Sequence, residues 1–415
     1  MKILLLTHYY APENSAPQRR WSALIERFTS AGHEVDVICP PPHYPSGRLD
    51  PQMREAHGPG SVERDEAGAR VFRVSFLRHD GRMHTRTLDH VWVAAATARR
   101  ARRLIDSGAI APDVIVATAP ALPSLVAGRA LARRYSIPLV AEMRDAWPDL
   151  VSHVAGFTPK RGLVQALKRV VHEQITGLQR DAARVVTTTE SFAAVLLERG
   201  VTEVAVIRNG TSVARYRGVP ERSTGHPELR ALYMGTIGRS QGLEVVVRAA
   251  ARLRDAGVPL QVRLVGHGVA LPRLRELNRA LGNPVEILGG VPGSEVVEHY
   301  AWADTCIVSL RDWAPFAWTV PSKLYELMAS GRHMTAIVAG ESAQLVREAG
   351  SGDIVLPGDV QSLVELWRRL QADGSRLDVG DRGRAWAARN ADYDAIANRY
   401  LAVLQSAVRP SPAPR

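Results

Sequence analysis

Residues 229–242 read LRALYMGTIGRSQG, an apolar run that passes directly into a short loop containing three glycines. The run Leu229–Met234 has the length and composition of a buried strand. The glycines after it permit a close approach of the backbone to a ligand, and the helical pattern from Leu243 offers unpaired amides at its start. A strand, a glycine loop and a helix in this order are typical of parallel α/β sheets.

The same alternation of short apolar strands and longer helical patterns extends in both directions from this stretch. Towards the end of the chain we expect further strands at 261–265, 285–288 and 305–310. In the other direction the expected strands are 2–7, 34–39, 70–76, 113–118, 138–142, 184–188 and 204–207. Two such series predict an α/β fold with two doubly wound, Rossmann-like domains that face a cleft lined by the carboxyl ends of their strands.

A break in this alternation predicts the domain boundary. Residues 215–228 contain several glycines and prolines, so we expect an interdomain linker there. The first domain is then 1–214 and the second 229–390, followed by a helix at 391–405 that crosses back to the first domain. The Pro- and Ser-rich residues 406–415 predict a disordered tail.

The composition indicates a globular protein with an anionic partner. The chain has 415 residues, of which 46% are hydrophobic and 23% charged, and its formal net charge is +11. A nucleotide, a phospholipid surface or a nucleic acid would each suit that charge. The sequence has neither zinc-finger spacing nor a recognisable RNA-binding signature, so we expect no nucleic-acid partner.

The apolar segments, cysteines and histidines bear on location and metal chemistry. The best apolar stretch, 110–128, contains Asp113 and three prolines and cannot be a continuous membrane-spanning helix. The first residues are typical of a buried strand rather than a signal peptide, so we expect a cytoplasmic protein. Cys39 and Cys306 are predicted core thiols, and histidines such as His43 and His267 have no partners at triad or metal-ligand spacing.

The loops that follow the strands of the second half form a candidate anion-binding site. The glycines at 235 and 238 and the helix start after them expose backbone amides, and Arg239 would add a fixed positive charge for phosphate oxygens. The loop residues expected to contact the ligand are Gly235, Thr236, Gly238, Gln241, Gly266, Gly268 and Val291. A tight turn with a solvated arginine is the alternative interpretation of the first loop.

The segment 319–331, TVPSKLYELMASG, is the most specific signal in the chain. Ser322 is a natural N-cap, Gly331 a natural stop, and Glu326 lies one helical turn after Ser322. The free amides of this helix start suit a pyrophosphate, and Glu326 can accept hydrogen bonds from ribose hydroxyls. A capped surface helix with an exposed glutamate is the alternative.

Taken in order, these blocks resemble the GT-B glycosyltransferases of family four, especially bacterial enzymes that build capsule, exopolysaccharide and O-antigen units. The resemblance runs nearly end to end. In the second half it rests on the loop at Gly235, the Gly266/Gly268 turn and the block 321–331. In the first half it rests on APE at 11–13, GHEV at 32–35, HYPSG at 43–47, DVIVATAP at 113–120, RDAWPD at 144–149 and RNG at 208–210.

The resemblance implies a retaining transfer without a metal or other cofactor, with a nucleotide-sugar donor bound by the second domain and the acceptor by the first. Beyond the loops already named, the implied donor-binding residues are Pro321, Ser322, Lys323, Leu324 and Glu326. Arg144 and Asp145 would lie near the reacting carbon, with Asp145 accepting the acceptor proton or orienting its hydroxyl. Glu13 and Asn14 would contact the acceptor. A purely structural corner around Arg144 is the alternative.

The sequence departs from the family pattern at two places in the site. The family usually has two glutamates eight positions apart, and Glu326 matches the second while the first falls at Trp318. The basic pair usual in the glycine loop is replaced by Thr236 and Gln241. This leaves Arg239 as the candidate cation that stabilises the departing diphosphate, with a lysine in the 319–331 segment as a reserve.

We therefore expect a hexosyltransferase that moves a sugar from a UDP-linked donor to a hydroxyl of a polysaccharide or lipid-linked glycan precursor. Tailoring of a soluble small molecule, a nucleotide-sugar epimerase and a non-catalytic binding protein stay open as alternatives. Two basic amphipathic segments, 91–103 and 159–172, predict docking of the first domain on an anionic membrane face. Burial of their apolar sides against the domain's own sheet is the alternative.

Overall fold

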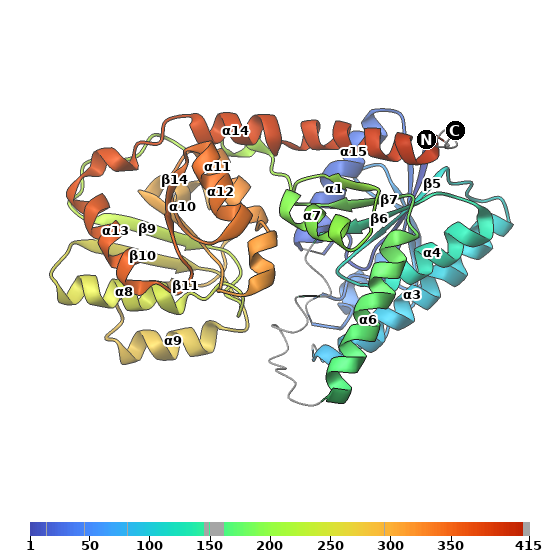
Figure 1. Ribbon diagram of the computed structural model, residues 1–415, viewed down its shortest axis with the longest axis horizontal. Helices are drawn as coiled ribbons and strands as arrows, with labels where there is room; N and C mark the ends of the chain where they lie inside the picture. The colour runs from blue at the N-terminus through green and yellow to red at the C-terminus, as the bar shows by residue number, and fades with distance from the viewer. Residues whose placement is uncertain are drawn as a thin grey trace. The chain divides into compact units, whose positions relative to one another are not determined.

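The computed structural model divides the chain into two compact units, each built around its own largely parallel sheet (Figure 1). It describes residues 1–13, 15–44, 46–80, 82–144, 149, 162–293 and 295–409. Of these, residues up to 149, 162–208 and 393–409 belong to the first unit, and the remainder belong to the second. The predicted fold class of two α/β domains with parallel sheets is thereby confirmed.

The sheet of the first unit has the strand order β3-β4-β2-β1-β5-β6-β7-β8, in which only the β3–β4 pair is antiparallel. From β1 the chain winds outward through β2 to β4, then returns to β5 and winds the other way, so the switch point lies between β1 and β5. The strands are β1 (Lys2–Leu6), β2 (Glu34–Cys39), β3 (Val62–Arg64), β4 (Arg70–Arg73), β5 (Val114–Thr118), β6 (Leu139–Met143), β7 (Arg184–Thr187) and β8 (Val204–Val206).

Helices cover both faces of this sheet. In Figure 1, α3, α4 and α6 lie side by side, while α1 packs with α15. The helices of the first unit are α1 (Ala16–Ser30), α2 (Arg54–His57), α3 (Met83–Asp106), α4 (Pro123–Tyr135), α6 (Gly162–Arg180), α7 (Glu190–Glu198) and α15 (Tyr393–Val408), with a short 3-10 turn η1 (Pro51–Met53).

The helix α15 completes the hydrophobic core of the first unit. Ile396, Tyr400 and Leu404 are buried in one cluster with Trp21 of α1 and Ile3 of β1. The rings of Trp21 and Tyr400 meet edge to face, with centroids 5.6 Å apart. The residues 393–409 therefore contribute to a core whose other members lie almost two hundred positions or more earlier in the chain.

The sheet of the second unit is entirely parallel, in the order β11-β10-β9-β12-β13-β14, with its switch point between β9 and β12. Its strands are β9 (Leu229–Met234), β10 (Leu260–Val265), β11 (Glu286–Leu288), β12 (Thr305–Ser309), β13 (His333–Ile337) and β14 (Gly352–Val355). Its helices are α8 (Glu244–Asp255), α9 (Leu271–Ala280), α10 (Val296–Trp302), α11 (Ser322–Ser330), α12 (Gly340–Ala349), α13 (Val360–Ala372) and α14 (Arg382–Asn390), with 3-10 turns η2 (Val213–Tyr216), η3 (Ala314–Trp318) and η4 (Gly374–Leu377).

Alternation along β9 divides the second unit into two core layers. Ala231 and Tyr233 belong to one cluster with residues of α8 and α13. Leu232 and Met234 belong to the other, with residues of α11 and α12. Because successive side chains of a strand point to opposite faces, both faces of the sheet are covered.

The division between the units and the end of the last helix lie a few residues from the positions expected from the sequence. The division between units falls between Arg208 and Asn209. Tyr216 and Val219, inside the expected linker at 215–228, are buried in the core of the second unit, because these apolar side chains pack there despite the glycines and prolines around them. The helix α15 continues to Val408, beyond the expected start of the tail at 406, and residues 410–415 lie outside the described residues.

Both cysteines are buried and free, as predicted. Burial raises the pKa of Cys39 to about 11 and that of Cys306 to about 12, so neither thiol is poised as a nucleophile. Among the described helices, none combines the length and apolar character that crossing a bilayer requires.

Replacing Tyr400 with alanine tests the role of α15. The side chain is fully buried, so Tyr400→Ala should lower the free energy of unfolding by on the order of 3 kcal/mol, because it leaves a cavity in the core. Urea denaturation followed by circular dichroism measures this loss. The exposed Gln405 of the same helix provides the control, and Gln405→Ala should change stability by less than about 0.5 kcal/mol. Equal stability of the two variants would contradict the packing of α15 into this core.

Candidate functional site

Two glycine loops are joined at the carboxyl ends of β9 and β10. The amide of Gly235 donates to the carbonyl of Val265 (2.9 Å), and the amide of Ile237 donates to the carbonyl of His267 (2.8 Å). Gly266 and Gly268 have φ of +148° and +158°, and a Cβ on either would overlap the carbonyl oxygen of Gly235 or Ile237. Glycine is therefore required at both positions, for backbone conformation and for space.

The first glycine loop is closed by its own side chains. The amide of Gly238 donates to Oε1 of Gln241 (3.0 Å), and the hydroxyl of Tyr233 donates to the carbonyl of Thr236 (2.6 Å). The carbonyl of Gln241 accepts a hydrogen bond from Oγ of Ser309 at the end of β12 (2.6 Å). Gln241, predicted as a ligand contact, thus uses its side chain to shape the loop, while Thr236 is exposed.

Arg311 is a residue of this site that the sequence did not reveal. It follows β12, its Nε donates to the carbonyl of Arg239 (2.5 Å), and its Nη2 pairs with Oε1 of Glu244 at the start of α8 (2.5 Å). A Cβ on Gly242 would lie 3.0 Å from Cγ of Arg311. Arg311 therefore braces the glycine loop against β12, whereas the side chain of Arg239 is exposed. The sequence did offer one signal for Arg311, since a charged residue that follows a buried strand of a parallel sheet lies at the edge where ligands bind.

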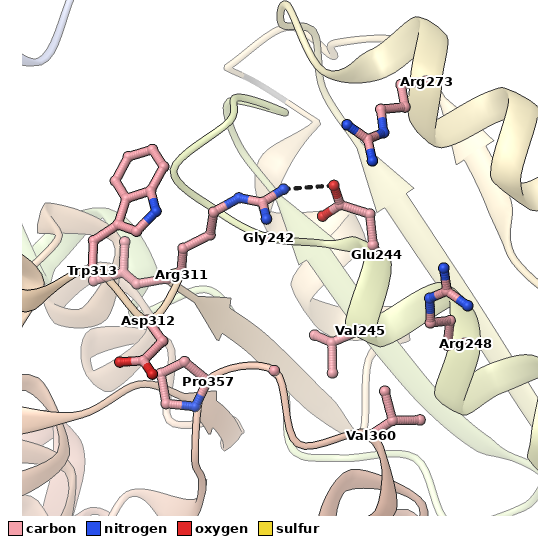
Figure 2. A pocket seen from close by; sticks show the side chains of 12 residues that line it. Gly242, Glu244, Val245, Arg248, Arg273, Arg311, Asp312, Trp313, Pro357 and Val360 are labelled. Carbon is pink, nitrogen blue, oxygen red and sulfur yellow. Dashed lines mark hydrogen bonds and ion pairs between the residues drawn. The ribbon is translucent and has the colours of Figure 1, made fainter. Parts of the chain in front are cut away.

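A cavity of about 420 Å³ opens beside this brace (Figure 2). Figure 2 shows Arg311 paired with Glu244, and Arg248 and Arg273 nearby on α8 and α9. The lining residues are Gly242, Glu244, Val245, Arg248, Arg273, Leu310, Arg311, Asp312, Trp313, Pro357, Gly358 and Val360. Three arginines against two carboxylates give this cavity a positive balance, which favours anionic groups.

The start of α11 lies against the first glycine loop. The closest side-chain carbon of Lys323 would be 3.6 Å from a Cβ on Gly235, which shows how near the two segments are. Nζ of Lys323 pairs with Oε2 of Glu326 (2.6 Å), and the side chain of Glu326 is 19% exposed. Burial, and then the charge of Glu326, raise the pKa of Tyr216 and of Tyr300. The structure thus brings together Gly235, Lys323 and Glu326, and the alternative of an exposed surface glutamate is disfavoured.

The N-cap of α11 differs from the prediction. The capping position is Pro321, with φ −66° and ψ 136° and no side-chain capping hydrogen bond, and Ser322 is the first helical residue. Proline fixes φ in the extended segment before the helix, so the helix begins at the next residue. The side chain of Leu324 is fully buried and anchors the helix. Gly331 ends the helix in the left-handed conformation (φ +69°), as predicted.

Other predicted positions lie around these loops. Trp318, where the family usually has its first glutamate, ends η3 and is half-buried. The amide of Gly290 donates to Nε2 of His267 (2.8 Å), which connects the loop after β11 to the second glycine loop. Val291 is half-buried and packs against the core on the α11 face.

The predicted residues of the first unit are only partly described. Glu13 is buried, and its Oε1 accepts hydrogen bonds from the amides of His43 (2.9 Å) and Tyr44 (3.0 Å). Burial raises the pKa of Glu13, and these hydrogen bonds oppose the rise. Glu13 therefore holds the loop after β2 in place. Arg144 follows β6 and is buried, and its carbonyl accepts from Oγ1 of Thr188 (3.0 Å). Asn14 and Asp145 lie outside the described residues.

Two parallel α/β units, one with glycine loops and a helix start gathered at its switch point, define the architecture of a GT-B glycosyltransferase. Residues 15–210 match the model of the glycosyl transferase 4-like domain, and residues 228–373 match that of the glycosyl transferases group 1. The chain belongs to the GT-B glycosyltransferases of family four, as the sequence motifs indicated.

Similar proteins agree with this assignment. The glycosyl transferase WcaI of Escherichia coli K12, named for colanic acid biosynthesis, is 28% identical over 97% of this chain and 99% of its own length. Sucrose-phosphate synthase from Thermosynechococcus elongatus has the same fold, with a TM-score of 0.73 at 17% identity, covering 97% of this chain and 98% of its own. The Anabaena protein HepE, in complex with UDP and glucose, has a TM-score of 0.67 at 18% identity, covering 98% of this chain and 100% of its own.

The contact between the glycine loops can be tested at Gly266. Gly266→Ala would place a methyl group against the carbonyl oxygen of Gly235 at a φ that alanine disfavours, so it should lower the free energy of unfolding by about 1–3 kcal/mol. Thermal or urea unfolding gives the measurement. Gly218 has open space around its Cβ position and no positive φ, so Gly218→Ala is the matched control and should be nearly neutral. A neutral Gly266→Ala would contradict the close approach.

Proposed function

We propose that this glycosyltransferase transfers a hexose, with retention of configuration, from a UDP-sugar to a hydroxyl of a polysaccharide or lipid-linked glycan precursor. The observation that carries the proposal is the convergence of the Gly235 loop with Lys323 and Glu326 at the switch point of the second unit. UDP and glucose in HepE support a UDP-sugar donor, and colanic acid biosynthesis by WcaI supports a glycan acceptor.

Each part of this site has a chemical task in the proposed reaction. The amides at the start of α11 and in the glycine loop would bind the diphosphate oxygens. Lys323 would stabilise the charge that grows on the leaving diphosphate, with Arg239 approaching from the exposed loop. Glu326, oriented by its ion pair with Lys323 (2.6 Å), would accept hydrogen bonds from the ribose hydroxyls.

The proposed transfer requires no metal, because protein cations and backbone amides replace it at the diphosphate. The Asp-X-Asp sequence of the chain, 392–394, uses its carboxylates elsewhere. Oδ2 of Asp392 accepts from the amide of Val213 (3.2 Å), and Oδ1 of Asp394 pairs with Nε of Arg27 (2.5 Å). Asp145 remains the proposed residue near the reacting carbon, on the resemblance alone.

Nucleotide binding in a chelator tests the donor site. Calorimetry with UDP and EDTA should show binding, and Glu326→Ala should weaken it by about 1–3 kcal/mol, because hydrogen bonds to a charged group are lost. Arg239→Ala should mainly slow turnover, since the leaving-group charge is largest in the transition state. Glu348 is exposed on α12, and Glu348→Ala should bind UDP normally. Binding that appears only after magnesium is added would overturn the metal-free site.

We also propose that the first unit docks on an anionic membrane through α3. Leu88, Val91 and Trp92 are 62%, 52% and 44% exposed and lie on one stripe of this helix. Arg99, Arg102 and Arg103 further along α3 are also exposed, whereas the guanidinium of Arg100 lies over the ring of Phe72 at 5.6 Å. An apolar stripe near exposed arginines suits an interface of acyl chains and anionic headgroups.

The second segment, 159–172, supports docking less directly. Val170 and Val171 of α6 are 56% and 44% exposed. Further along the same helix, Ile175 and Leu178 are buried, so that part of α6 packs against its own unit as the alternative interpretation expected. The side chains of 159–168 lie outside those described.

Sedimentation with phosphatidylglycerol vesicles tests this docking. The protein should pellet with the vesicles at low salt and return to the supernatant as salt screens the arginines. Leu88→Ser combined with Val91→Ser should reduce pelleting several-fold, because both apolar contacts with the lipid are lost. Val269 in the second unit is 77% exposed, and Val269→Ser controls for a general loss of exposed apolar surface. A protein that stays in the supernatant at low salt has no such docking face.

A further inference from the structure

Three titratable side chains that the proposed transfer does not use meet in the interior of the first unit. His8 follows β1, His43 follows β2, and Asp89 lies in α3; all three are buried, Asp89 completely. Oδ2 of Asp89 is 3.0 Å from Nε2 of His43 and 3.3 Å from Nε2 of His8. We call these three residues the His8–Asp89 cluster.

The orientation of the His43 ring in this cluster is fixed by a hydrogen bond at Nδ1, the nitrogen that does not face Asp89. Nδ1 of His43 lies 2.7 Å from the carbonyl oxygen of Pro41. A carbonyl oxygen can only accept, so Nδ1 carries the hydrogen. In the neutral ring Nε2 then presents a lone pair to a carboxylate oxygen 3.0 Å away. Two such groups repel each other unless a cation, either a proton or a metal ion, lies between them.

The carboxylate of Asp89 is likewise oriented by a hydrogen bond to the backbone, at Oδ1. Its Oδ1 accepts a hydrogen bond from the amide of Leu77 (2.7 Å). Oδ2 is then left to face the two imidazoles. A hydrogen bond to the backbone behind a ligand, as His43 and Asp89 have here, is an arrangement that orients metal ligands in proteins. Nδ1 of His8 is buried and has no such partner among the described residues.

The spacing of the cluster agrees with a small divalent ion. Its three ligand atoms lie within 4.8 Å of one another. In a tetrahedral zinc site with bonds of about 2.0 Å, neighbouring ligand atoms are about 3.3 Å apart. The distances from Oδ2 of Asp89 to Nε2 of His43 and of His8, 3.0 Å and 3.3 Å, are close to this value. Two imidazoles and one carboxylate are ligands for zinc and similar transition metals rather than for calcium or magnesium.

We propose that His8, His43 and Asp89 form a binding site for one divalent transition-metal ion of the zinc class in the first unit. The ion would replace the proton between His43 and Asp89 and would join the segments after β1 and β2 to α3. Glu13 lies beside this site, with Oε1 4.0 Å from Nδ1 of His43 and Oε2 buried without a hydrogen-bond partner in the described residues. Its charge would help to balance the excess positive charge of the ion.

This site is independent of the proposed donor chemistry. Its ligands all belong to the first unit, whereas the residues proposed to bind the nucleotide belong to the second. Metal binding is therefore expected to stabilise the first unit and to leave UDP affinity unchanged. Anything that binds only the folded state raises its melting temperature by mass action.

The experiment titrates zinc into tag-free, chelator-treated full-length protein. Calorimetry should give one tight equivalent, and the melting temperature should rise with zinc concentration. His43→Asn should weaken zinc binding on the order of 100-fold or more, since loss of a ligand exceeds the usual effect of losing an outer contact. His84 is exposed on α3, so His84→Asn controls for adventitious binding by surface histidines and should bind zinc like the wild type.

A second variant and a second metal ion distinguish loss of the metal site from misfolding of the protein. His8→Gln removes one imidazole but keeps a polar side chain, and it should lose zinc while retaining the UDP affinity of the wild type. Cobalt(II) added to the wild type should give the visible absorption of a low-coordinate site, and His8→Gln should abolish it. Absence of a stoichiometric zinc equivalent, or equal weakening by His43→Asn and His84→Asn, would overturn the proposal and leave a proton as the cation between His43 and Asp89.

Discussion

The candidate donor site depends on one close approach, between the backbones that leave β9 and β10. The hydrogen bonds from Gly235 to Val265 and from Ile237 to His267 continue the parallel pairing beyond the strands themselves. No side chain fits at Gly266 or Gly268 while this pairing persists. The same contact fixes where Tyr233 and Gln241 shape the loop, and it places the loop beside the start of α11.

Most of the strands were predictable because they are short, largely apolar runs followed by glycine, proline or polar residues, whereas β3, β13 and β14 were not among the expected strands. The sequence also predicts that the last helix crosses back to the first unit, and α15 packs into the core of that unit. The exact linker was not predictable, because Tyr216 and Val219 are apolar residues among turn formers, and only their burial shows to which unit they belong. Likewise Ser322 has the chemistry of a cap, but Pro321 occupies that place.

Within the site, the sequence indicates residues that lie close together along the chain. It does not indicate residues whose partners are distant in the sequence. Lys323 and Glu326 lie one turn apart on a single helix, so their spacing is visible in the sequence. Arg311 acts through Glu244, which belongs to a different element, and this pairing exists only after β9 and β12 lie next to each other. His8, His43 and Asp89 show no ligand spacing in the sequence, yet His8 and His43 follow two neighbouring parallel strands, and Asp89 of α3 lies against them.

The position of α15 has a consequence for how the protein is made on the ribosome. The first unit lacks Ile396, Tyr400 and Leu404 until the ribosome has translated them, although most of its sheet emerges early. The described residues of the second unit lie between 209 and 392, so this unit is translated while the first unit still lacks α15. Until α15 is made, the apolar side chains of α1 that it covers stay exposed in the nascent first unit. Chaperones bind surfaces of this kind during synthesis.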